Sequence, residues 1–335
     1  MPDPMTKELW NLDESTYPAD KALSEKLAFL LNYAQLAPSS HNSQPWQFSV
    51  QDSEVHLYPD LHYWLKVADP GRRELYISLG CALENLLIAA EHFQLGYQAN
   101  FFSDRDGKEH FASVTFTEDS PTVNVRDPEL FNTIPRRRTS RELFQSRLIP
   151  KEELLQIKAA WLEKDLQLHF IANIQQKRRL AEMVKTADKT LNANPAYRHE
   201  LAEALGQGAF GTQWPWSRLA QLMVRHINFG ARLGNQNAQS LLSAPVLILL
   251  GTDKDDAISQ IKIGQLYERI ALTATKLGLS TQPLSQILEI PSLRQELAAM
   301  LPHAKLVPQH FFRLGYPSQL KAHTPRRAVP KNSIL

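Results

Sequence analysis

The chain reads Ala37-Pro38-Ser39-Ser40-His41-Asn42-Ser43-Gln44-Pro45-Trp46 where a helical pattern gives way to an extended one. Residues 20–37 carry apolar side chains at helical spacing, and Pro38 ends that pattern. Residues 46–50 and 55–58 then alternate like two paired strands around a turn at 51–53. The loop between them is rich in short hydroxyl and amide side chains, which offer hydrogen-bond donors and acceptors at several angles to a polar ligand.

Further elements follow in a mixed helix and strand pattern. We predict helices at 80–94, 151–161, 176–191 and 261–277, and strands at 112–116, 167–171, 245–250 and 311–314. Residues 118–135 are polar and contain prolines, which is typical of a connection between units. The sequence therefore predicts two units, residues 1–130 and residues 131–335.

An internal repeat relates the two units. A shift of 184 positions aligns Gly80 with Gly264 without a gap, together with the pairs Asp69/Asp253, Ile77/Ile261, Glu84/Glu268, Ala90/Ala274 and Leu95/Leu279. We expect these two helices to stack at the centre of a fused pseudo-dimer. The alternative is that two amphipathic helices resemble each other through composition alone.

Composition excludes several classes of protein. The chain has 335 residues, a length that suits two packed units or one large α/β domain. Its 43% hydrophobic and 21% charged residues are typical of an ordinary globular protein. A net charge of +2 gives no reason to expect a nucleic-acid partner, and no apolar run approaches the roughly 20 residues that cross a bilayer. The single cysteine, Cys81, excludes a disulfide within the chain and fits the cytoplasm, and the histidines lack the spacing of a metal site.

Positive charge is concentrated in two short segments. Arg137-Arg138-Thr139-Ser140-Arg141 precedes Phe144, and Arg326-Arg327 lies in the tail. Arginine clusters are usually solvated faces, but planar guanidinium groups are also suited to bidentate hydrogen bonding with phosphate oxygens.

These motifs together resemble the nitroreductase family over roughly residues 25–330. The loop at 37–46 is similar to its flavin-contacting segment, the segment from Arg137 to Phe144 to its opening motif, and the tail from Phe312 to Pro317 with Arg326-Arg327 to its closing motif. The resemblance implies an α+β, FMN-dependent fold of the fused, pseudo-dimeric Acg type. It also implies a lid over the flavin, at residues 194–237, which contain Trp214 and Trp216; the alternative is a helical excursion with its tryptophans in the core.

The resemblance also implies the residues that hold FMN. The loop would contribute Pro38, Ser39, Ser40, Asn42 and Gln44. The phosphate would be held by Arg137, Arg138, Thr139, Arg141, Arg326 and Arg327. The turn Gln282-Pro283-Leu284-Ser285 would lie along the ring, with the backbone N–H of Leu284 or Ser285 near flavin N5, and Asn237 would pair with the pyrimidine edge. The loop occurs only in the first half and the arginine motifs only in the second, so one complete site per chain is expected.

The implied function is an NAD(P)H-dependent FMN oxidoreductase acting on a small conjugated acceptor such as a nitroaromatic or quinone. Because the chemistry belongs to the flavin, no catalytic side chain is required, and His41 is either a plain loop histidine or a donor to substrate. The alternatives are a protein that sequesters FMN beneath a closed lid and a flavin-consuming or dehalogenating enzyme. A monomer or a weak homodimer is expected.

Overall fold

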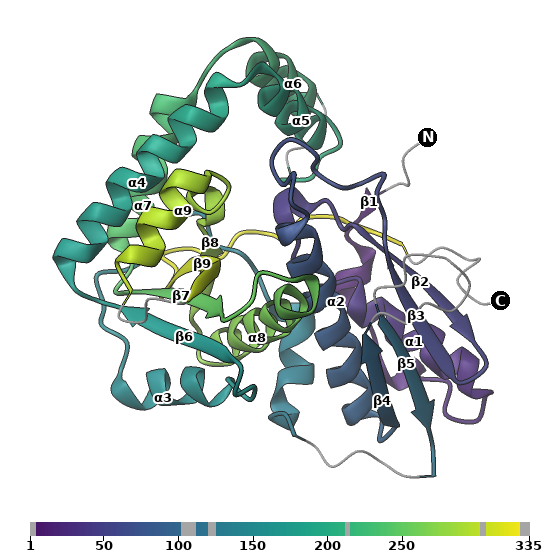
Figure 1. Ribbon diagram of the computed structural model, residues 1–335. Helices are drawn as coiled ribbons and strands as arrows, with labels where there is room; N and C mark the ends of the chain where they lie inside the picture. Colours follow the sequence, from purple (N-terminus) through teal and green to yellow (C-terminus); the bar gives the residue numbers. More distant parts are fainter. Residues whose placement is uncertain (1–4, 102–111, 120–124, 212–214, 302–305, 329–335) are drawn as a thin grey trace.

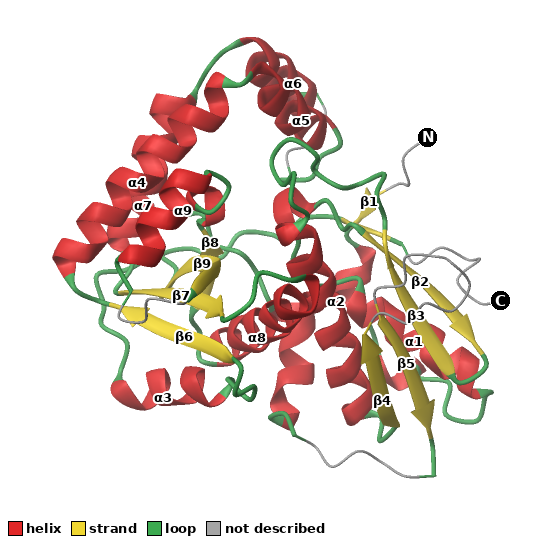
Figure 2. Cartoon of the chain, in the orientation of Figure 1, coloured by secondary structure: helices red, strands yellow, loops and turns green. Residues whose placement is uncertain are grey.

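The computed structural model describes residues 5–101, 112–119, 125–211, 215–301 and 306–328. Two four-stranded antiparallel sheets lie on either side of a central helix pair (Figures 1 and 2). The first contains β2 (Trp46–Gln51), β3 (Glu54–Pro59), β4 (Gly96–Phe101) and β5 (Ala112–Thr117) in the order β2-β3-β5-β4. The second contains β6 (Leu166–Ile171), β7 (Val246–Thr252), β8 (Ser280–Pro283) and β9 (Val307–Gly315) in the order β6-β7-β9-β8. Taken in chain order, the two sheets have the same topology.

The helices extend this equivalence. The first half contains α1 (Leu23–Ala34) and α2 (Arg73–His92), and the second contains α3 (Lys151–Ala159), α8 (Ala257–Lys276) and α9 (Pro291–Ala299). Apart from α9, which lies between β8 and β9, and the helices inserted between β6 and β7, the order α1-β2-β3-α2-β4-β5 in the first half therefore matches α3-β6-β7-α8-β8-β9 in the second. A short antiparallel pair, β1 (Met5–Thr6) with β10 (Arg326–Arg327), joins the N-terminal segment to the tail.

Helices α2 and α8 form the centre of the molecule (Figure 1). A Cβ on Gly80 would lie 2.1 Å from the carbonyl oxygen of Ile261, and a Cβ on Gly264 would lie 2.0 Å from that of Ile77. Each contact is the repeat-related copy of the other, as in an interface between two identical surfaces. The fold is thus an α+β pseudo-dimer in one chain, and the predicted stacking of the repeated helices is confirmed.

A long helical excursion separates the first two strands of the second sheet. It consists of α4 (Ile174–Ala193), α5 (Pro195–Gly206), α6 (Trp216–His226) and α7 (Gly230–Ser243), with α5 and α6 at its far end (Figure 1). In the first half a tight turn joins the equivalent strands β2 and β3. The excursion is longer than the insertion predicted at 194–237. Trp214 lies outside the described residues, while Trp216 is 67% exposed and so does not pack into a core.

Several predicted boundaries shift. The helix predicted at 80–94 begins at Arg73, because its first turn is charged and does not continue the apolar pattern. Strands β4 and β8 and helix α9 were not predicted from the sequence. The predicted division at residue 130 falls within the 3-10 helix η5 (Pro128–Arg136), which contacts both α2 and α8, and residues 120–124 of that connection lie outside the described residues. None of the helices in the described ranges combines the length and apolar character needed to cross a membrane.

Candidate cofactor site

The polar loop adopts an uncommon backbone conformation. It passes from α1 through the 3-10 turn η3 (Ser40–Asn42) to β2, and His41, Asn42 and Gln44 have φ angles of 51°, 56° and 49°. Left-handed backbone at non-glycine residues costs conformational energy and persists only where surrounding contacts impose it. One such contact is the hydrogen bond that the Gln44 N–H donates to Ser39 Oγ, at 2.8 Å. A loop held in this way presents its polar side chains in fixed directions.

The tail arginines meet this loop. Arg326 Nη1 donates a hydrogen bond to Asn42 Oδ1 at 2.6 Å, and the Arg327 N–H donates to Gln44 Oε1 at 2.8 Å. Asn42 Nδ2 in turn donates to the carbonyl oxygen of Pro325 at 2.9 Å. The structure therefore brings together two of the predicted loop residues and both of the predicted tail residues.

The arginine motif of the second half reaches the same place. Arg137 Nη2 and Arg326 Nη2 both donate to the carbonyl oxygen of Leu36, at 3.1 Å and 3.4 Å. Both side chains are buried, and Arg137 Nε lies 3.4 Å from a carboxylate oxygen of Glu268. Within the described part of the chain, the buried Nε atoms of Arg137, Arg138 and Arg326 have no hydrogen-bond acceptor.

Crowding of these cations is electrostatically unfavourable. Burial, then the charge of Arg137, lowers the pKa of Arg326 well below its ordinary value. Burial, then Arg138 and Arg137, lowers the pKa of the nearby His323 to about 4. Glu268 offers limited neutralisation, because its own burial raises its pKa to about 7 despite Arg137. The arrangement fits a phosphate, which would supply acceptors and negative charge to the guanidinium groups.

The rest of the arginine motif runs beside the predicted flavin turn. Thr139 forms a parallel bridge with Thr281, and the Ser140 N–H donates to the carbonyl oxygen of Thr281 at 3.2 Å. The Arg141 side chain is exposed, and its guanidinium lies 4.4 Å from the centre of the Phe210 ring. Thr139 is also exposed, so both side chains are accessible to a ligand beside the buried cluster.

The turn at 282–285 is held by the neighbouring strand β9. Gln282 Oε1 accepts from Arg313 Nε at 2.6 Å, and Pro283 pairs with Phe312. The Leu284 N–H donates to the carbonyl oxygen of Phe311 at 2.8 Å, so this group is already engaged. Of the two backbone donors considered for the flavin, this bond favours Ser285.

Asn237 occupies α7, where its Nδ2 donates to Asp188 Oδ2 at 2.9 Å. Gln286 Nε2 donates to the same carboxylate oxygen at 3.2 Å. Asn237 is thus linked through Asp188 to the residue that follows Ser285, but its amide donor is engaged with the carboxylate. Its predicted contact with a pyrimidine edge stays a prediction.

A charged network that sequence reasoning missed connects the loop to the turn. Ser40 Oγ donates to Glu74 Oε2 at 2.8 Å, and Glu74 Oε1 lies 2.7 Å from Arg73 Nη1 and 3.7 Å from His310 Nδ1. The other end is a 3.2 Å contact between His310 Nδ1 and Ser285 Oγ. Burial alone would raise the pKa of Glu74, but Arg73 and His310 hold it below its ordinary value. The available signal in the sequence was a charged pair, Arg73-Glu74, that opens an otherwise apolar helix.

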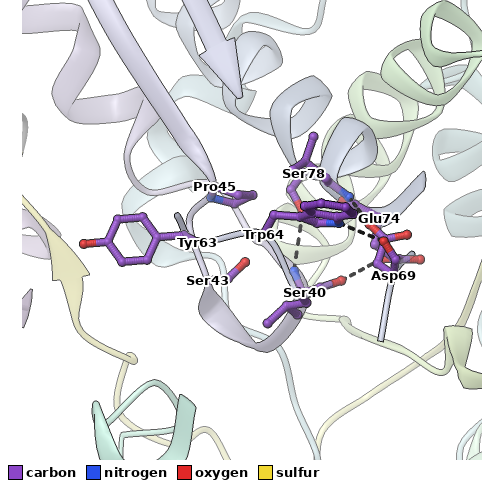
Figure 3. Close-up of a pocket in the computed structure, with 10 residues that line it drawn as sticks. Ser40, Ser43, Pro45, Tyr63, Trp64, Asp69, Glu74 and Ser78 are labelled. Atoms are coloured by element: carbon purple, nitrogen blue, oxygen red, sulfur yellow. Dashed lines mark hydrogen bonds between the residues drawn. The ribbon is translucent and has the colours of Figure 1, made fainter. Parts of the chain in front are cut away.

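A small cleft borders this network (Figure 3). Its lining includes Ser40, Tyr63, Trp64, Asp69 and Glu74. Burial, then Glu74, raises the pKa of Asp69 to about 7. The cleft encloses about 10 Å³, which is space for roughly one water molecule, so it is not the binding site of a nucleotide.

The helical excursion contacts the loop directly. Asn42 Nδ2 donates to the carbonyl oxygen of Ala209 at 3.1 Å, and the His41 ring lies 5.8 Å from that of Phe210. The carboxylate of Glu200 on α5 accepts the backbone N–H groups of Val67 at 3.0 Å and Ala68 at 2.9 Å. Burial and the charge of Arg141 lower the pKa of His41 to about 4, which keeps the imidazole neutral at physiological pH.

The repeat-related position on the other side of the central helices is filled by ion pairs. Glu84, the counterpart of Glu268, is bound by Arg126 and by Arg269 Nη1, the latter at 2.9 Å. Arg269 Nε also donates to the carbonyl oxygen of Ala160 at 3.0 Å. Burial would raise the pKa of Glu84, but the two guanidinium groups lower it to about 2. The two sides of the pseudo-dimer are therefore chemically different.

Comparison with known proteins agrees with this architecture. The model of the Nitroreductase family matches residues 134–316. A putative NAD(P)H nitroreductase of Mycobacterium tuberculosis is 28% identical over 88% of this chain and 86% of its own length, and the putative NAD(P)H nitroreductase acg of that organism is 26% identical over 89% and 90%. The probable NAD(P)H nitroreductase PigM of Serratia is 24% identical over 89% and 90%.

Among solved structures, an FMN-bound nitroreductase from Bacteroides fragilis is 18% identical, with a TM-score of 0.39, and the match covers 59% of this chain and 95% of that one. The family match spans more than half of the sequence and includes the arginine motif, the central helix α8 and the strand β9. The chain belongs to the nitroreductase family.

Proposed function

We propose that this protein is an NAD(P)H-dependent FMN oxidoreductase whose acceptor is a conjugated small molecule such as a nitroaromatic or a quinone. Bound FMN would supply the hydride chemistry between NAD(P)H and the acceptor. Support comes from membership of the family and from relatives that are named as NAD(P)H nitroreductases. The protein's own part is to bind, orient and shield the flavin.

The observation that carries the proposal is the convergence of Arg137 and Arg326 on the Leu36 carbonyl oxygen. One arginine comes from the second half and one from the tail, and the acceptor directly precedes the polar loop of the first half. Buried cations need a counter-charge, and a phosphate at this junction would touch all three segments. Arg138, Thr139, Arg141 and Arg327 would complete the phosphate site.

A single site per chain is part of the proposal. The counterpart of this junction contains Glu84, Arg269 and Glu163, which already satisfy one another; Arg269 Nη2 lies 2.5 Å from Glu163 Oε1. The expected flavin content is therefore about one FMN per chain, measured by absorbance after denaturation. A content of two per chain would reject this assignment.

Arginine substitution tests the phosphate site. Arg137→Ala with Arg141→Ala is expected to weaken FMN binding by about a hundredfold, because each lost charge-assisted hydrogen bond contributes about 1.4 kcal/mol or more. The measurement is quenching of FMN fluorescence during titration of apoprotein. Arg136→Ala is the matched control, since Arg136 is an exposed neighbour of Arg137 that lies outside the proposed phosphate site. Unchanged affinity in the double variant would contradict the phosphate assignment.

Sequestration of FMN is the second candidate function, favoured by the bonds from the excursion to the loop at Asn42 and to the Val67-Ala68 backbone. Closed contacts of this kind would slow the entry of a nicotinamide. Anaerobic mixing with NADH or NADPH separates the two functions: rapid loss of absorbance near 450 nm supports the oxidoreductase, and an unchanged spectrum supports storage. If the wild-type protein is reduced slowly and Glu200→Ala is reduced rapidly, the helical excursion is what blocks access of the nicotinamide to the flavin.

A further inference from the structure

Helix α6 is amphipathic, but its apolar side faces outward. Trp216 is 67% exposed, Leu219 49%, Leu222 57% and Met223 42%, and the side chains recur at the three- and four-residue spacing of one helical face. The buried side chain of the helix is Ser217. A surface helix in a globular protein normally buries its apolar side, so this orientation leaves an apolar surface without a described partner.

The inward side of α6 is polar and packs closely on α5. A Cβ on Gly206 of α5 would lie 2.4 Å from Gln221 Oε1, so the amide of Gln221 sits directly against the neighbouring helix. α5 is also the helix that contacts the η3 loop, whereas α6 lies at the far end of the excursion (Figure 1). The orientation of α6 is therefore set by its packing on α5, and its apolar face points away from α5.

The charges on α6 and in the segment that follows it have one sign. The sequence contains no aspartate or glutamate from residue 204 to residue 252, whereas Arg218, Arg225, His226 and Arg232 lie within that range. Arg218 donates to Gln221 Oε1 at 2.9 Å, and within the described residues no ion pair joins Arg218, Arg225 or Arg232 to a carboxylate. α6 thus carries basic side chains beside its apolar face, and the exposed acid of the neighbouring helix α5, Glu203, lies 3.0 Å from His199 and not from these arginines.

We propose that α6 docks the protein on an anionic lipid surface. A short helix with exposed tryptophan, leucine and methionine side chains and basic flanks matches the amphipathic helices that lie in the plane of a membrane interface. Trp216 at the start of the helix is suited to the headgroup boundary, because the indole combines an apolar body with a polar N–H. Such contact lies flat on the membrane and needs no spanning helix.

A second copy of this chain fits the same face less well. Symmetric pairing of two α6 helices would place Arg218, Arg225 and His226 of one copy near the same residues of the other, and like charges at an interface are unfavourable. An anionic headgroup layer instead supplies the opposite charge along the whole basic border. The observed charge pattern therefore favours lipid over self-association.

Vesicle sedimentation tests the proposal with the full-length protein. We expect binding to phosphatidylcholine vesicles that contain phosphatidylglycerol, little binding to pure phosphatidylcholine, and a blue shift of tryptophan emission on binding that Trp216→Phe removes. Leu219→Ser with Leu222→Ser should lower the partition coefficient by at least about tenfold. Arg218→Gln with Arg225→Gln should lower it by about fivefold per charge and reduce its dependence on salt.

The matched control is Leu155→Ser, which removes a 56% exposed leucine from α3 and should leave partition unchanged. Retained FMN content in each variant shows that it is folded. Equal binding to neutral and anionic vesicles, or no binding to either, would overturn the proposal. So would a concentration-dependent dimer in sedimentation equilibrium that the Leu219→Ser with Leu222→Ser variant abolishes, because a second copy would then be the occupant.

Discussion

Substitution of Gly80 by alanine tests the central helix contact most directly. The added methyl carbon would lie 2.1 Å from the Ile261 carbonyl oxygen and 3.0 Å from the Gly264 Cα, both backbone atoms. An ordinary contact needs about 3.4 Å, so α2 and α8 must separate by roughly 1 Å in a close-packed core. Overpacking of this kind costs about 3 kcal/mol, and the better helix propensity of alanine returns about 1 kcal/mol. The expected net loss is about 2 kcal/mol.

The assay is thermal unfolding of FMN-saturated protein, in which a loss of this size lowers Tm by about 3 °C for a chain of 335 residues. Gly71→Ala is the control, because a Cβ at that position would have no neighbour within 4 Å. Gly264→Ala should act like Gly80→Ala, since its Cβ would meet the repeat-related carbonyl oxygen of Ile77 at 2.0 Å. The double variant should cost less than the sum of the two, because one substitution already separates the helices. A Tm for Gly80→Ala equal to that of Gly71→Ala would refute the reasoning.

Three further predictions concern the cofactor region. The Trp10 ring stacks on His323 at 4.0 Å between ring centres, and its centre lies 4.7 Å from the Arg326 guanidinium. Trp10→Ala should therefore weaken FMN binding by about tenfold, because it removes a contact worth about 1 kcal/mol or more. Fluorescence titration measures the affinity; Trp10→Phe should be intermediate between wild type and Trp10→Ala, and wild-type affinity in Trp10→Ala would contradict the prediction. Because the folded-state pKa of His323 is about 4 and its ordinary value is 6.5, its contribution to stability is complete above pH 6.5 and is lost as pH falls toward 4. Urea unfolding from pH 7 to pH 4 should show a decline that is smaller in His323→Phe, and an identical decline in both proteins would count against this assignment. Glu74→Gln removes the carboxylate between Arg73 and Ser40 and should destabilise the protein by about 3 kcal/mol in urea unfolding, whereas the exposed Glu25→Gln should change stability by less than about 0.5 kcal/mol.

The sequence was sufficient for the main elements because their signals are local. The hairpin of β2 and β3 was predicted from alternating apolar residues and a turn. The repeat was visible in the sequence because the close approach of the two helix backbones requires glycine at both equivalent positions, Gly80 and Gly264. The two arginine-rich segments, residues 137–141 and 326–327, were also recognisable, since few other patterns place so many guanidinium groups in so short a segment. The family, the fold class and the expected cofactor followed from these signals.

The network of Arg73, Glu74 and His310 could not be predicted in this way. Arg73 and Glu74 are adjacent, but His310 is more than 200 positions away and meets them only in the folded chain, so no periodicity or spacing records the contact. Strand β8 was missed for a related reason, because a four-residue edge strand containing Pro283 lacks a clear alternation. The outward apolar side of α6 was equally hidden, since periodicity shows that a helix has an apolar side but not which way it turns.

The different ion-pair partners of Glu84 and Glu268 show that the two halves need not carry the same amino-acid replacements. When two identical chains associate, every amino-acid replacement occurs on both sides of the symmetry axis and must be tolerated in both surroundings. Joining the halves in one gene removes that restriction, so Glu84 could acquire Arg126 and Arg269 as partners while Glu268 kept Arg137 alone. A single chain can thus reinforce one side with ion pairs and leave the other side open to the proposed phosphate.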